Sequence, residues 1–562
     1  MVLSQKAPDA RMPRKKLRPR APSAPCPPRS QARSTKIPGI PFLERHSIVL
    51  AVLLVAVASV RIAATYTALS VTVDEPGHLA CGLQYLAMHI YRYESQHPPL
   101  ARAMMAAGPY LKGVRPIGED NRGKEGIELL ARSSNPERLL ALMRIGILPF
   151  FLLACGVVYY WAKHYFGNSV AAIATGLFTL LPPVLADGGL ATTDMALAAT
   201  LGAAFLALIL WTETGSWKHS ALLGITSALA ALSKFTALGF LPVAAIFALL
   251  FYIWIYKPGG QKLRAFTKQR AAGFGFAVAT GALVVWAGYL FSFGKIPGSR
   301  LSLPAPEFFD GIGVAMRHDA GGHTAYLLGQ LGHDGWWYYF PVALAVKTPI
   351  GFLLLLAAGA CLAWKYRFHG AALPGAFALG VLLPSMAGRV DIGIRHILPA
   401  YIGFSILAAL AMVQLAERAT GAILAGAAVL WMAVSGAVHH PDYLSYFNEF
   451  AGHEPEKILL DSNLDWGQDL KLLAKRLREL GVHEFFEYGI DAAGQYAYFQ
   501  SWYGLPPVRI TNPYQPQAGW HVISATVAKT MPLNAWYDHL VPTEKIGGLM
   551  LFKILPNFSP GS

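Results

Sequence analysis

Charged residues are scarce in this sequence, and their scarcity excludes several classes of protein. Asp, Glu, Lys and Arg make up 14% of the chain, whereas 54% is hydrophobic and the mean hydropathy is +0.40. Soluble domains carry about 25% charged residues. The composition therefore excludes a cytosolic enzyme, an intrinsically disordered protein and a nucleic-acid binder with a basic, water-facing surface. We expect a polytopic helical membrane protein, mainly α in fold class.

Cysteine is also rare, with four residues in a chain of 562. Cys26 lies near the N-terminus, Cys155 and Cys361 lie in apolar runs, and Cys81 alone falls in a long polar loop. A disulfide framework needs several cysteines that can pair on an oxidising face. We therefore expect no disulfide within a domain.

Much of the formal net charge of +15 comes from the N-terminal segment. Residues 1–46 hold eleven lysines and arginines among many prolines, with Asp9 and Glu44 as the only acids. Such a composition cannot build a core, and the length before the first apolar run differs from that of a cleaved signal peptide. We predict a disordered basic cytoplasmic tail that contacts anionic membrane lipid, and no nucleic-acid partner.

Apolar runs long enough to cross a hydrocarbon core of about 30 Å recur along residues 47–437. If the tail is cytoplasmic, basic connections such as those at Lys163, Lys218 and Lys257 also fall inside, as the positive-inside rule requires. This alternation predicts a multi-pass plasma (inner) membrane protein with its N-terminus inside and its C-terminus outside. About eleven spans are predicted, near 47–66, 141–162, 169–186, 190–212, 219–235, 236–256, 271–293, 339–364, 371–387, 396–415 and 419–437.

Three polar stretches then share the predicted outer face. The transmembrane domain, residues 47–437, contributes loops 67–138 and 294–338, and residues 438–562 form a small extracytoplasmic α/β domain. In that domain, apolar residues at helical spacing predict a helix over 468–480. Strands are predicted near 485–490, 507–511, 520–525 and 548–554.

Two adjacent carboxylates, Asp74 and Glu75, follow the first span directly. Ionisable groups are costly at a membrane boundary and therefore mark a candidate functional site. The simpler alternative is that Asp74 caps a helix whose first turn holds Glu75 and Pro76. The apolar spacing from Gly77 to Tyr91 predicts that this helix is amphipathic and lies on the membrane surface.

A second pair of acids, Asp187 and Asp194, lies at the outer turn between the third and fourth spans. Here too the simpler alternative is a cap, with Thr193 or Asp194 beginning the fourth span. Cations on the outer face break the inner charge bias and suit an anionic group such as a phosphate, although a lone lysine can also snorkel. The candidates are Lys234, Arg389, Arg395 and His396.

Histidine and aromatic residues gather in the outer loops. His97 precedes a Pro-Pro turn, where a lone histidine is more often structural, and Arg102 follows in a second amphipathic stretch. The aromatic residues of loop 294–338 are typical of a membrane-interface belt, and they are also surfaces on which sugar rings stack. Its His and Asp residues could bind a divalent metal, but no spacing assigns one. Residues 461–465 begin like a calcium loop, but the later glycine and glutamate positions do not match.

Taken in order, short motifs along the chain resemble the membrane-embedded glycosyltransferases of the GT-C superfamily. The likeness is to the dolichyl-phosphate-mannose-dependent protein mannosyltransferase branch and to its bacterial relatives that modify lipid A with aminoarabinose. It covers most of the membrane part. The motifs are Asp74-Glu75, His97-Pro98-Pro99, Ala191-Thr192-Thr193-Asp194, Ser233-Lys234, residues 322–329 and 335–341, Lys347-Thr348-Pro349, Arg395-His396, and residues 443–449 and 461–469.

The resemblance implies a sugar donor built on a polyprenyl phosphate and an acceptor hydroxyl on a protein, lipid or glycan. It implies that Asp74 is the base of an inverting displacement, with Glu75 and Asp194 orienting the acceptor or tuning that base. The donor phosphate would be held by Lys234, Arg395, His396 and Arg389. Candidate substrate-binding residues are His97, Arg102, Asp187, His323, Tyr326, Trp336 and Trp337.

One residue departs from the pattern, and one alternative function remains. The lipid A-modifying relatives have lysine before the Pro-Pro pair where this chain has His97, so aminoarabinose as the donor sugar is in question. The alternative is a transporter or flippase of a lipid-linked sugar, which should show internal repeats and polar breaks at mid-bilayer. We find no repeat, and the acids and bases gather at one face.

Overall fold

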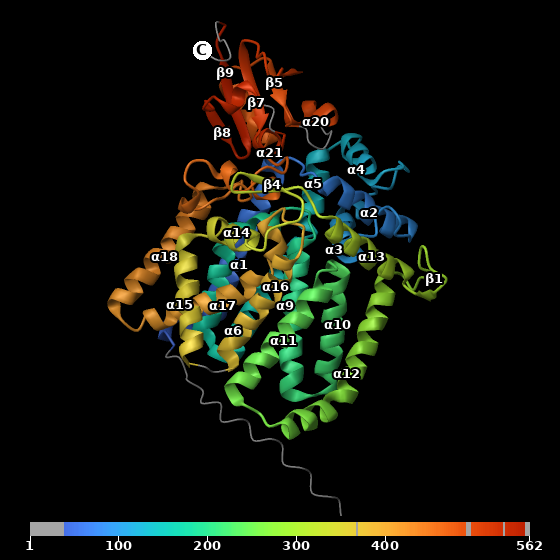
Figure 1. Ribbon diagram of the computed structural model, residues 1–562, viewed down its shortest axis with the longest axis vertical. Helices are drawn as coiled ribbons and strands as arrows, with labels where there is room; N and C mark the ends of the chain where they lie inside the picture. Colours follow the sequence, from blue (N-terminus) through green and yellow to red (C-terminus); the bar gives the residue numbers. More distant parts are fainter. Residues whose placement is uncertain (1–38, 367–368, 491–495, 532–533, 557–562) are drawn as a thin grey trace, which may run out of the picture. The chain divides into compact units, whose positions relative to one another are not determined.

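The computed structural model describes residues 39–366, 369–490, 496–531 and 534–556, and most of them are helical (Figure 1). The described residues all belong to one compact unit. The predicted N-terminal tail lies almost wholly outside the described residues. The first helix, α1 (Pro41–Ala68), already begins within the range assigned to that tail.

Each predicted span contains a helix, which confirms the mainly helical polytopic fold, but fewer helices meet the length of a full span than we predicted. Among the described residues, seven helices are long and apolar enough to cross a membrane, or up to nine if each of two bent pairs counts as one span. The count of about eleven included α10 (Trp217–Ser233) and α17 (Ala400–Leu415), which are shorter. The seven are α1, α5–α6 (Pro136–Ile145 and Leu148–Phe166), α9 (Asp194–Thr214), α11 (Ala237–Tyr256), α12 (Gly260–Gly288), α16 (His369–Ala387) and α18 (Ala419–Val438).

Proline interrupts two spans. Helices α7 (Asn168–Leu180) and α8 (Pro182–Gly189) meet at 66°, and α14 (Tyr339–Lys347) and α15 (Ile350–Tyr366) meet at 119°. Pro182 and Pro349 lie at these bends, where proline lacks the amide that would continue the helix. The bends place the ends of α8 and α14 beside the same pocket, described below.

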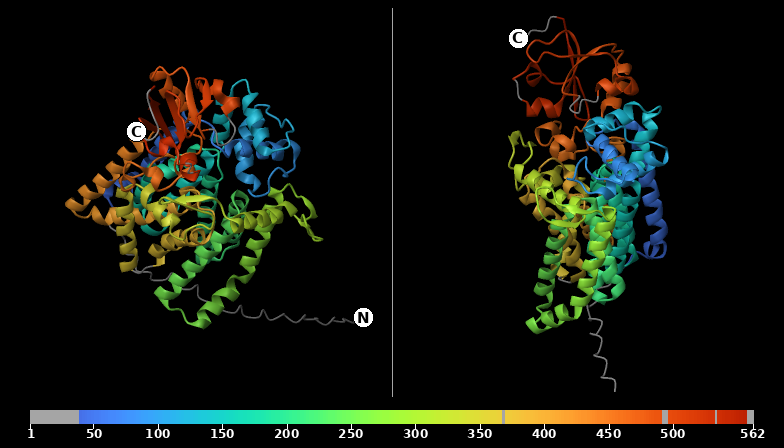
Figure 2. Two further views of the ribbon diagram at one scale, coloured as in Figure 1. Left: turned by 45° about the horizontal axis from the view of Figure 1, so that its top comes forward. Right: turned by 90° about the vertical axis from the view of Figure 1, so that its right-hand side faces the viewer.

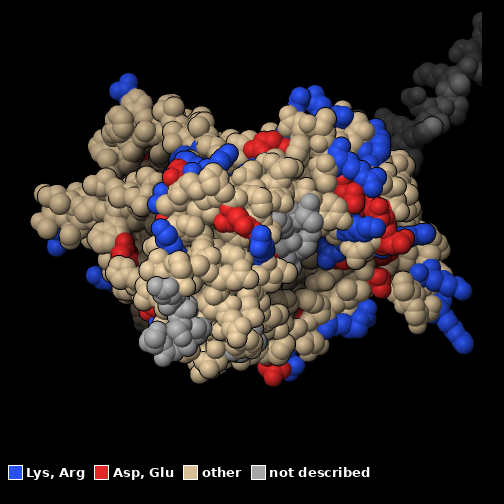
Figure 3. All heavy atoms as spheres, turned by 90° about the horizontal axis from the view of Figure 1, so that it is seen from above, with Lys and Arg blue, Asp and Glu red and all other residues tan. Residues whose placement is uncertain are grey.

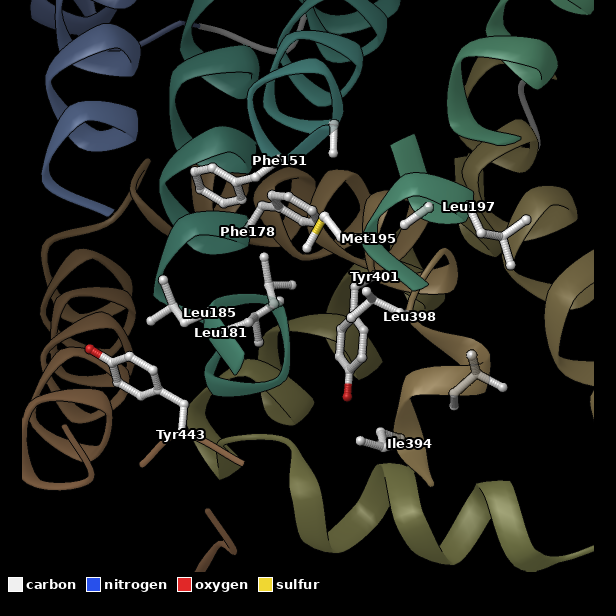
Figure 4. Close-up of a cluster of buried hydrophobic side chains, with 14 of the residues drawn as sticks. Phe151, Phe178, Leu181, Leu185, Met195, Leu197, Ile394, Leu398, Tyr401 and Tyr443 are labelled. Atoms are coloured by element: carbon white, nitrogen blue, oxygen red, sulfur yellow. The ribbon is translucent and has the colours of Figure 1, made fainter. Parts of the chain in front are cut away.

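The spanning helices pack in a bundle whose members lie side by side in both views of Figure 2, with α11 against α16 and α10 between α9 and α12. Only 6% of the apolar window of α12 is buried, so most of its surface is free to face lipid. In the interior, Phe151, Phe178 and Met195 meet where α6, α7 and α9 converge (Figure 4). Between membrane-spanning helices such contacts stabilise the bundle through van der Waals packing, because lipid tails are as apolar as these side chains.

The predicted loop 67–138 folds into α2 (Glu75–Met88), α3 (Pro99–Leu111) and α4 (Arg122–Ala131). The prediction that α2 lies as an amphipathic helix on the membrane surface is wrong, because every residue from Glu75 to Gln84 is buried. Glycines permit this packing: a Cβ at Gly126 would lie 1.9 Å from the Pro76 carbonyl oxygen. Helix α4 therefore covers α2, and α3 packs on its other side.

The predicted loop 294–338 contains strands and a helix that the sequence did not predict. Two short antiparallel hairpins pair β1 (Phe293–Lys295) with β2 (Ser302–Pro304), and β3 (Ala325–Leu327) with β4 (Gln330–Gly332). Helix α13 (Pro306–Gly321) lies between them in the chain. Three-residue strands carry too little alternation to be recognised from sequence.

The C-terminal segment forms the predicted α/β unit. Its five-stranded sheet has the order β6-β5-β7-β9-β8, in which β6, β5 and β7 are parallel and β9 and β8 are antiparallel to their neighbours. The four predicted strands and the predicted helix are present, and β8 was missed. The elements are α19 (Leu470–Glu479), β5 (Phe485–Tyr488), α20 (Tyr496–Tyr503), β6 (Val508–Ile510), β7 (Gly519–Ser524), α21 (Ala525–Thr530), β8 (Glu544–Ile546) and β9 (Leu549–Ile554).

Candidate active site

Arg395 lies at the centre of a charged group assembled from distant parts of the chain. It sits in a short 3-10 helix, η1 (Ile394–Ile397), immediately before α17. Its Nη1 donates to Asp74 Oδ2 at 3.4 Å and to Asp194 Oδ2 at 3.5 Å. Its Nε donates to the Ser462 hydroxyl at 3.1 Å, and its guanidinium lies 4.0 Å from the centre of the Trp466 ring. One cation thus connects loop 67–138, α9 and the segment before the C-terminal sheet.

Asp194 and Lys234 form the second ion pair of this group. Lys234 Nζ donates to Asp194 Oδ1 at 2.6 Å. Asp194 is the first residue of α9, and Lys234 lies in the turn between α10 and α11, as the sequence predicted for this lysine. The side chain of Asp194 is only 1% exposed and does not cap its helix, so the capping alternative is wrong for this residue.

Asp74 is the open member of the group. It occupies the N-cap position of α2, yet its side chain makes no capping hydrogen bond and turns to Arg395 instead. Its side chain is 34% exposed. Of the two carboxylates that share Arg395, Asp74 is therefore the one that another molecule can reach.

A small pocket adjoins this group at the bent ends of α8 and α14. Its lining includes Asp187, Lys347, Arg395, Tyr443, Leu444 and Ser462. Asp187 and Lys347 are both buried, at 5% and 2% exposure. The pocket therefore has a carboxylate and two cations on its wall.

Two histidines lie close to the cations of this group. Burial, together with Lys234 and Arg395, holds the pKa of His396 well below its usual range, so this imidazole is neutral at pH 7. Its ring stacks near Phe340. Burial also lowers the pKa of His97, although the adjacent Glu94 carboxylate opposes that shift.

Glu75 is engaged elsewhere, although it follows Asp74 in the chain. Its two carboxylate oxygens accept from Nε and Nη2 of Arg144 at 2.8 and 2.9 Å, and also from the backbone amides of Thr72 and Ala191. Burial raises its pKa, but Arg144 and these hydrogen bonds outweigh burial and lower it. Glu75 is fully buried with four donors around it and does not face the pocket.

Arg102 is likewise part of the packed interior of the first outer loop. It is fully buried, donates to His78 and Tyr91, and pairs with Glu94. The structure therefore places Arg102 behind His97, where it supports the turn that carries this histidine.

Among the described residues, the remaining sequence candidates make no hydrogen bond or ion pair with Arg395. Arg389 is half exposed and contacts Asp334 at the surface, and Figure 3, which views the end that carries the C-terminal sheet, shows cations and acids side by side on that face. Tyr326 packs into the C-terminal apolar cluster, whereas Trp337 is exposed. His323 is half-buried and its Nδ1 bonds to the neighbouring Thr324 carbonyl, and the backbone amide of Trp336 donates to Asp391.

Three residues near Arg395 and Asp187 belong to the sequence motifs but were not predicted to have a role. They are Lys347, Ser462 and Trp466. Their common signal is polarity or aromaticity at a break between apolar runs, which also occurs at ordinary turns. Only the fold brings them to Arg395 and Asp187. No cluster of three or more His, Cys, Asp or Glu side chains suited to a metal ion is present among the described residues.

One protein-family model matches part of the chain. Residues 141–286 match the family model described as dolichyl-phosphate-mannose-protein mannosyltransferase. This match confirms the predicted resemblance to GT-C membrane glycosyltransferases and the predicted enzyme class, a glycosyltransferase. No curated protein matches the sequence.

Solved structures of two proteins show a distant likeness. ArnT from Cupriavidus metallidurans in the apo state is 14% identical, with 89% of this chain and 97% of that chain covered and a TM-score of 0.48. The same protein bound to undecaprenyl phosphate gives a TM-score of 0.45 at 14% identity and the same coverage. The oligosaccharyltransferase of Archaeoglobus fulgidus is 12% identical, with 85% and 66% covered and a TM-score of 0.43. At these TM-scores the likeness has no bearing on individual site residues.

Proposed function

We propose that this protein transfers a sugar from a polyprenyl-phosphate donor to a hydroxyl of a protein, lipid or glycan acceptor at the extracytoplasmic face of the plasma (inner) membrane. The family match supports a lipid-linked donor, because the matched family is described by its use of dolichyl-phosphate mannose. The observation that carries the proposal is the Arg395 group, in which an open carboxylate, Asp74, shares a cation with a buried one, Asp194.

In the proposed reaction, the acceptor oxygen attacks the anomeric carbon of the donor while the bond from that carbon to the phosphate oxygen breaks. The acceptor proton passes to a carboxylate oxygen of Asp74, and the bonding electrons leave with the polyprenyl phosphate. A single displacement of this kind inverts the anomeric centre. A base placed in this way contributes roughly 10²–10⁴-fold to the rate.

Lys234 and Arg395 are the proposed phosphate ligands. Charge grows on the leaving phosphate in the transition state, so fixed cations near it lower the barrier. Burial lowers the pKa of Arg395, but the Asp194 and Asp74 carboxylates outweigh burial and raise it, which keeps the guanidinium charged. The neutral imidazole of His396 would add a hydrogen bond without a further charge.

Asp194 holds Lys234 and Arg395 in place in this proposal. Because it is buried and paired with both cations, it suits positioning better than proton transfer. Glu75 takes a supporting role as well, since its four donors leave it no free edge toward the pocket.

The test compares wild type with Asp74→Asn, reconstituted as the full chain in liposomes with a radiolabelled polyprenyl-phosphate mannose and a membrane extract as acceptor source. We expect loss of labelled donor to slow by at least about 10²-fold in the variant. Asp334→Asn, the same change at an exposed position, is the matched control and should keep its rate. Full turnover by folded Asp74→Asn would refute the assignment of the base, and movement of intact donor across the bilayer would support the transport alternative.

A further inference from the structure

Asp187 presents a buried carboxylate to the pocket without a partner. It lies near the end of α8, is buried and lines the pocket. Within the part of the chain that the structure describes, the carboxylate accepts no hydrogen bond and no cation lies within 4.0 Å of it. Burying a carboxylate in this way is costly unless a donor reaches it.

Lys347 lines the same pocket, and one N–H group of its ammonium has no hydrogen-bond acceptor among the described residues. Its ammonium donates to the backbone carbonyls of Leu444 at 2.7 Å and Asn463 at 2.6 Å. An ammonium has three N–H groups, so two carbonyls leave one unassigned. No carboxylate of the described residues lies within 4.0 Å of it, and the Phe447 ring lies 4.2 Å away. The two carbonyls hold the head group at the pocket wall, close to Leu444 and Ser462 of the lining.

We propose that Asp187 and Lys347 together bind one hydroxyl group of the transferred sugar. The hydroxyl donates to the Asp187 carboxylate and accepts from the free N–H of Lys347. This proposal rests on the proposed function and deepens it, because it names the chemistry of the donor sugar. Lys347 is a substrate-binding residue in this account, and it was not among the predicted site residues.

A hydroxyl fits this pair better than the other groups that sugars carry. It is both a hydrogen-bond donor and an acceptor, which matches a carboxylate opposite an ammonium. A cationic amino group could satisfy Asp187 but would be repelled by Lys347 and by Arg395 on the same lining. A hydrogen atom would leave both charges unpaired. The pocket therefore favours a neutral, hydroxylated sugar over an amino sugar.

The size of the expected discrimination follows from the cost of unpaired groups. Sites built to hydrogen-bond a substrate hydroxyl reject the analogue that lacks it by about 10⁴–10⁵-fold. We expect at least about 10²-fold here, because a water molecule can enter in place of the missing hydroxyl.

The test measures equilibrium binding to the full chain in nanodiscs. The probes are bare polyprenyl phosphate, the same phosphate carrying mannose, glucose, galactose or 4-amino-arabinose, and monodeoxy forms of the neutral sugar that binds most tightly. We expect a neutral sugar donor to bind more tightly than the bare phosphate, and one monodeoxy form to lose about 10²-fold. Asp187→Asn and Lys347→Met should each abolish most of that discrimination and leave the affinity for bare polyprenyl phosphate within about threefold.

Matched controls separate a local effect from a general one. Asp334→Asn and Lys457→Met make the same charge changes at exposed positions and should bind like wild type. Lys347→Arg keeps the donors and should restore part of the discrimination. If a pocket variant does not fold, the deoxy series on wild type decides alone.

Three outcomes would overturn the proposal. In the first, Lys347→Met loses affinity equally for the sugar donor and for bare polyprenyl phosphate. In the second, every monodeoxy analogue binds as tightly as its parent sugar donor. In the third, the protein binds the amino-sugar donor more tightly than the neutral ones. Absence of polyprenyl-phosphate binding by wild type would instead refute the proposed function itself. The two failures are therefore distinguishable.

Discussion

The Glu75–Arg144 pair provides the sharpest test of how this site is built. The sequence grouped Glu75 with the catalytic acids, whereas the structure surrounds it with four donors and buries it completely. Arg144 also donates to the backbone carbonyls of Tyr66, Leu69 and Ser70, so the pair connects the end of α1 to α5. Removing one partner of a buried ion pair costs about 3–5 kcal/mol, because the other charge is left uncompensated.

We therefore expect Glu75→Gln and Arg144→Met each to lower the free energy of unfolding by about 3–5 kcal/mol. Gln can accept at one oxygen only, and its amide group would face a backbone N–H donor. The double variant should be less destabilised than the sum of the two, because neither charge is then left alone. SDS titration of the full chain in mixed micelles, followed by circular dichroism, measures these differences.

Kinetics decide between the structural role and the catalytic one. At SDS concentrations below those that unfold it, Glu75→Gln should consume lipid-linked donor within a fewfold of the wild-type rate. A variant with wild-type stability and a rate reduced by about 10²-fold or more would refute this reasoning and return Glu75 to the reacting groups. Glu454→Gln, in an exposed pair with Lys457, is the control for the substitution itself.

Two further predictions concern stability. Burial raises the pKa of Asp465 from 3.8 to about 6, even though the Ser524 hydroxyl donates to this carboxyl group. The protonated carboxyl group therefore contributes to the free energy of unfolding below about pH 4, and this contribution is lost as the pH rises through about 6. Asp465→Asn should therefore stabilise the protein by about 3 kcal/mol at pH 8 and by little at pH 4, measured by SDS titration at both values; equal effects at the two values would contradict this. Gly126→Ala should lower the free energy of unfolding by about 1–3 kcal/mol, because the new Cβ would meet the Pro76 carbonyl. Gly156→Ala is the control, because open space surrounds Gly156, and its free energy of unfolding should stay close to that of the wild type. Equal unfolding midpoints for the two variants would contradict this prediction, because α4 could then move away from α2 without loss of stability.

The helical membrane fold could be predicted because hydrophobic length is a local property of the chain. A helix needs about 20 apolar residues to cross the bilayer. Residues 47–66 and 419–437 are runs of about this length, and the structure has helices at both. The turn at Lys234 and the helix after Gln468 were also correct, since a polar break and a helical period are both visible in a short window. The burial of α2 was missed because it depends on α4, which covers it from elsewhere in the sequence.

The sequence by itself determined the class of the protein, its helices, and the residue types at the candidate site. Charge is so costly in an apolar chain that Asp74, Asp194, Lys234 and Arg395 stood out without a structure. Tertiary structure alone decided which of these groups meet. It brought residues more than 300 positions apart, such as Asp74 and Arg395, into contact, paired Glu75 with Arg144 instead, and placed Lys347 and Asp187 on the wall of one pocket. The physical reason is that these contacts depend on the bends at Pro182 and Pro349 and on how the connecting loops pack, and no local pattern encodes that packing.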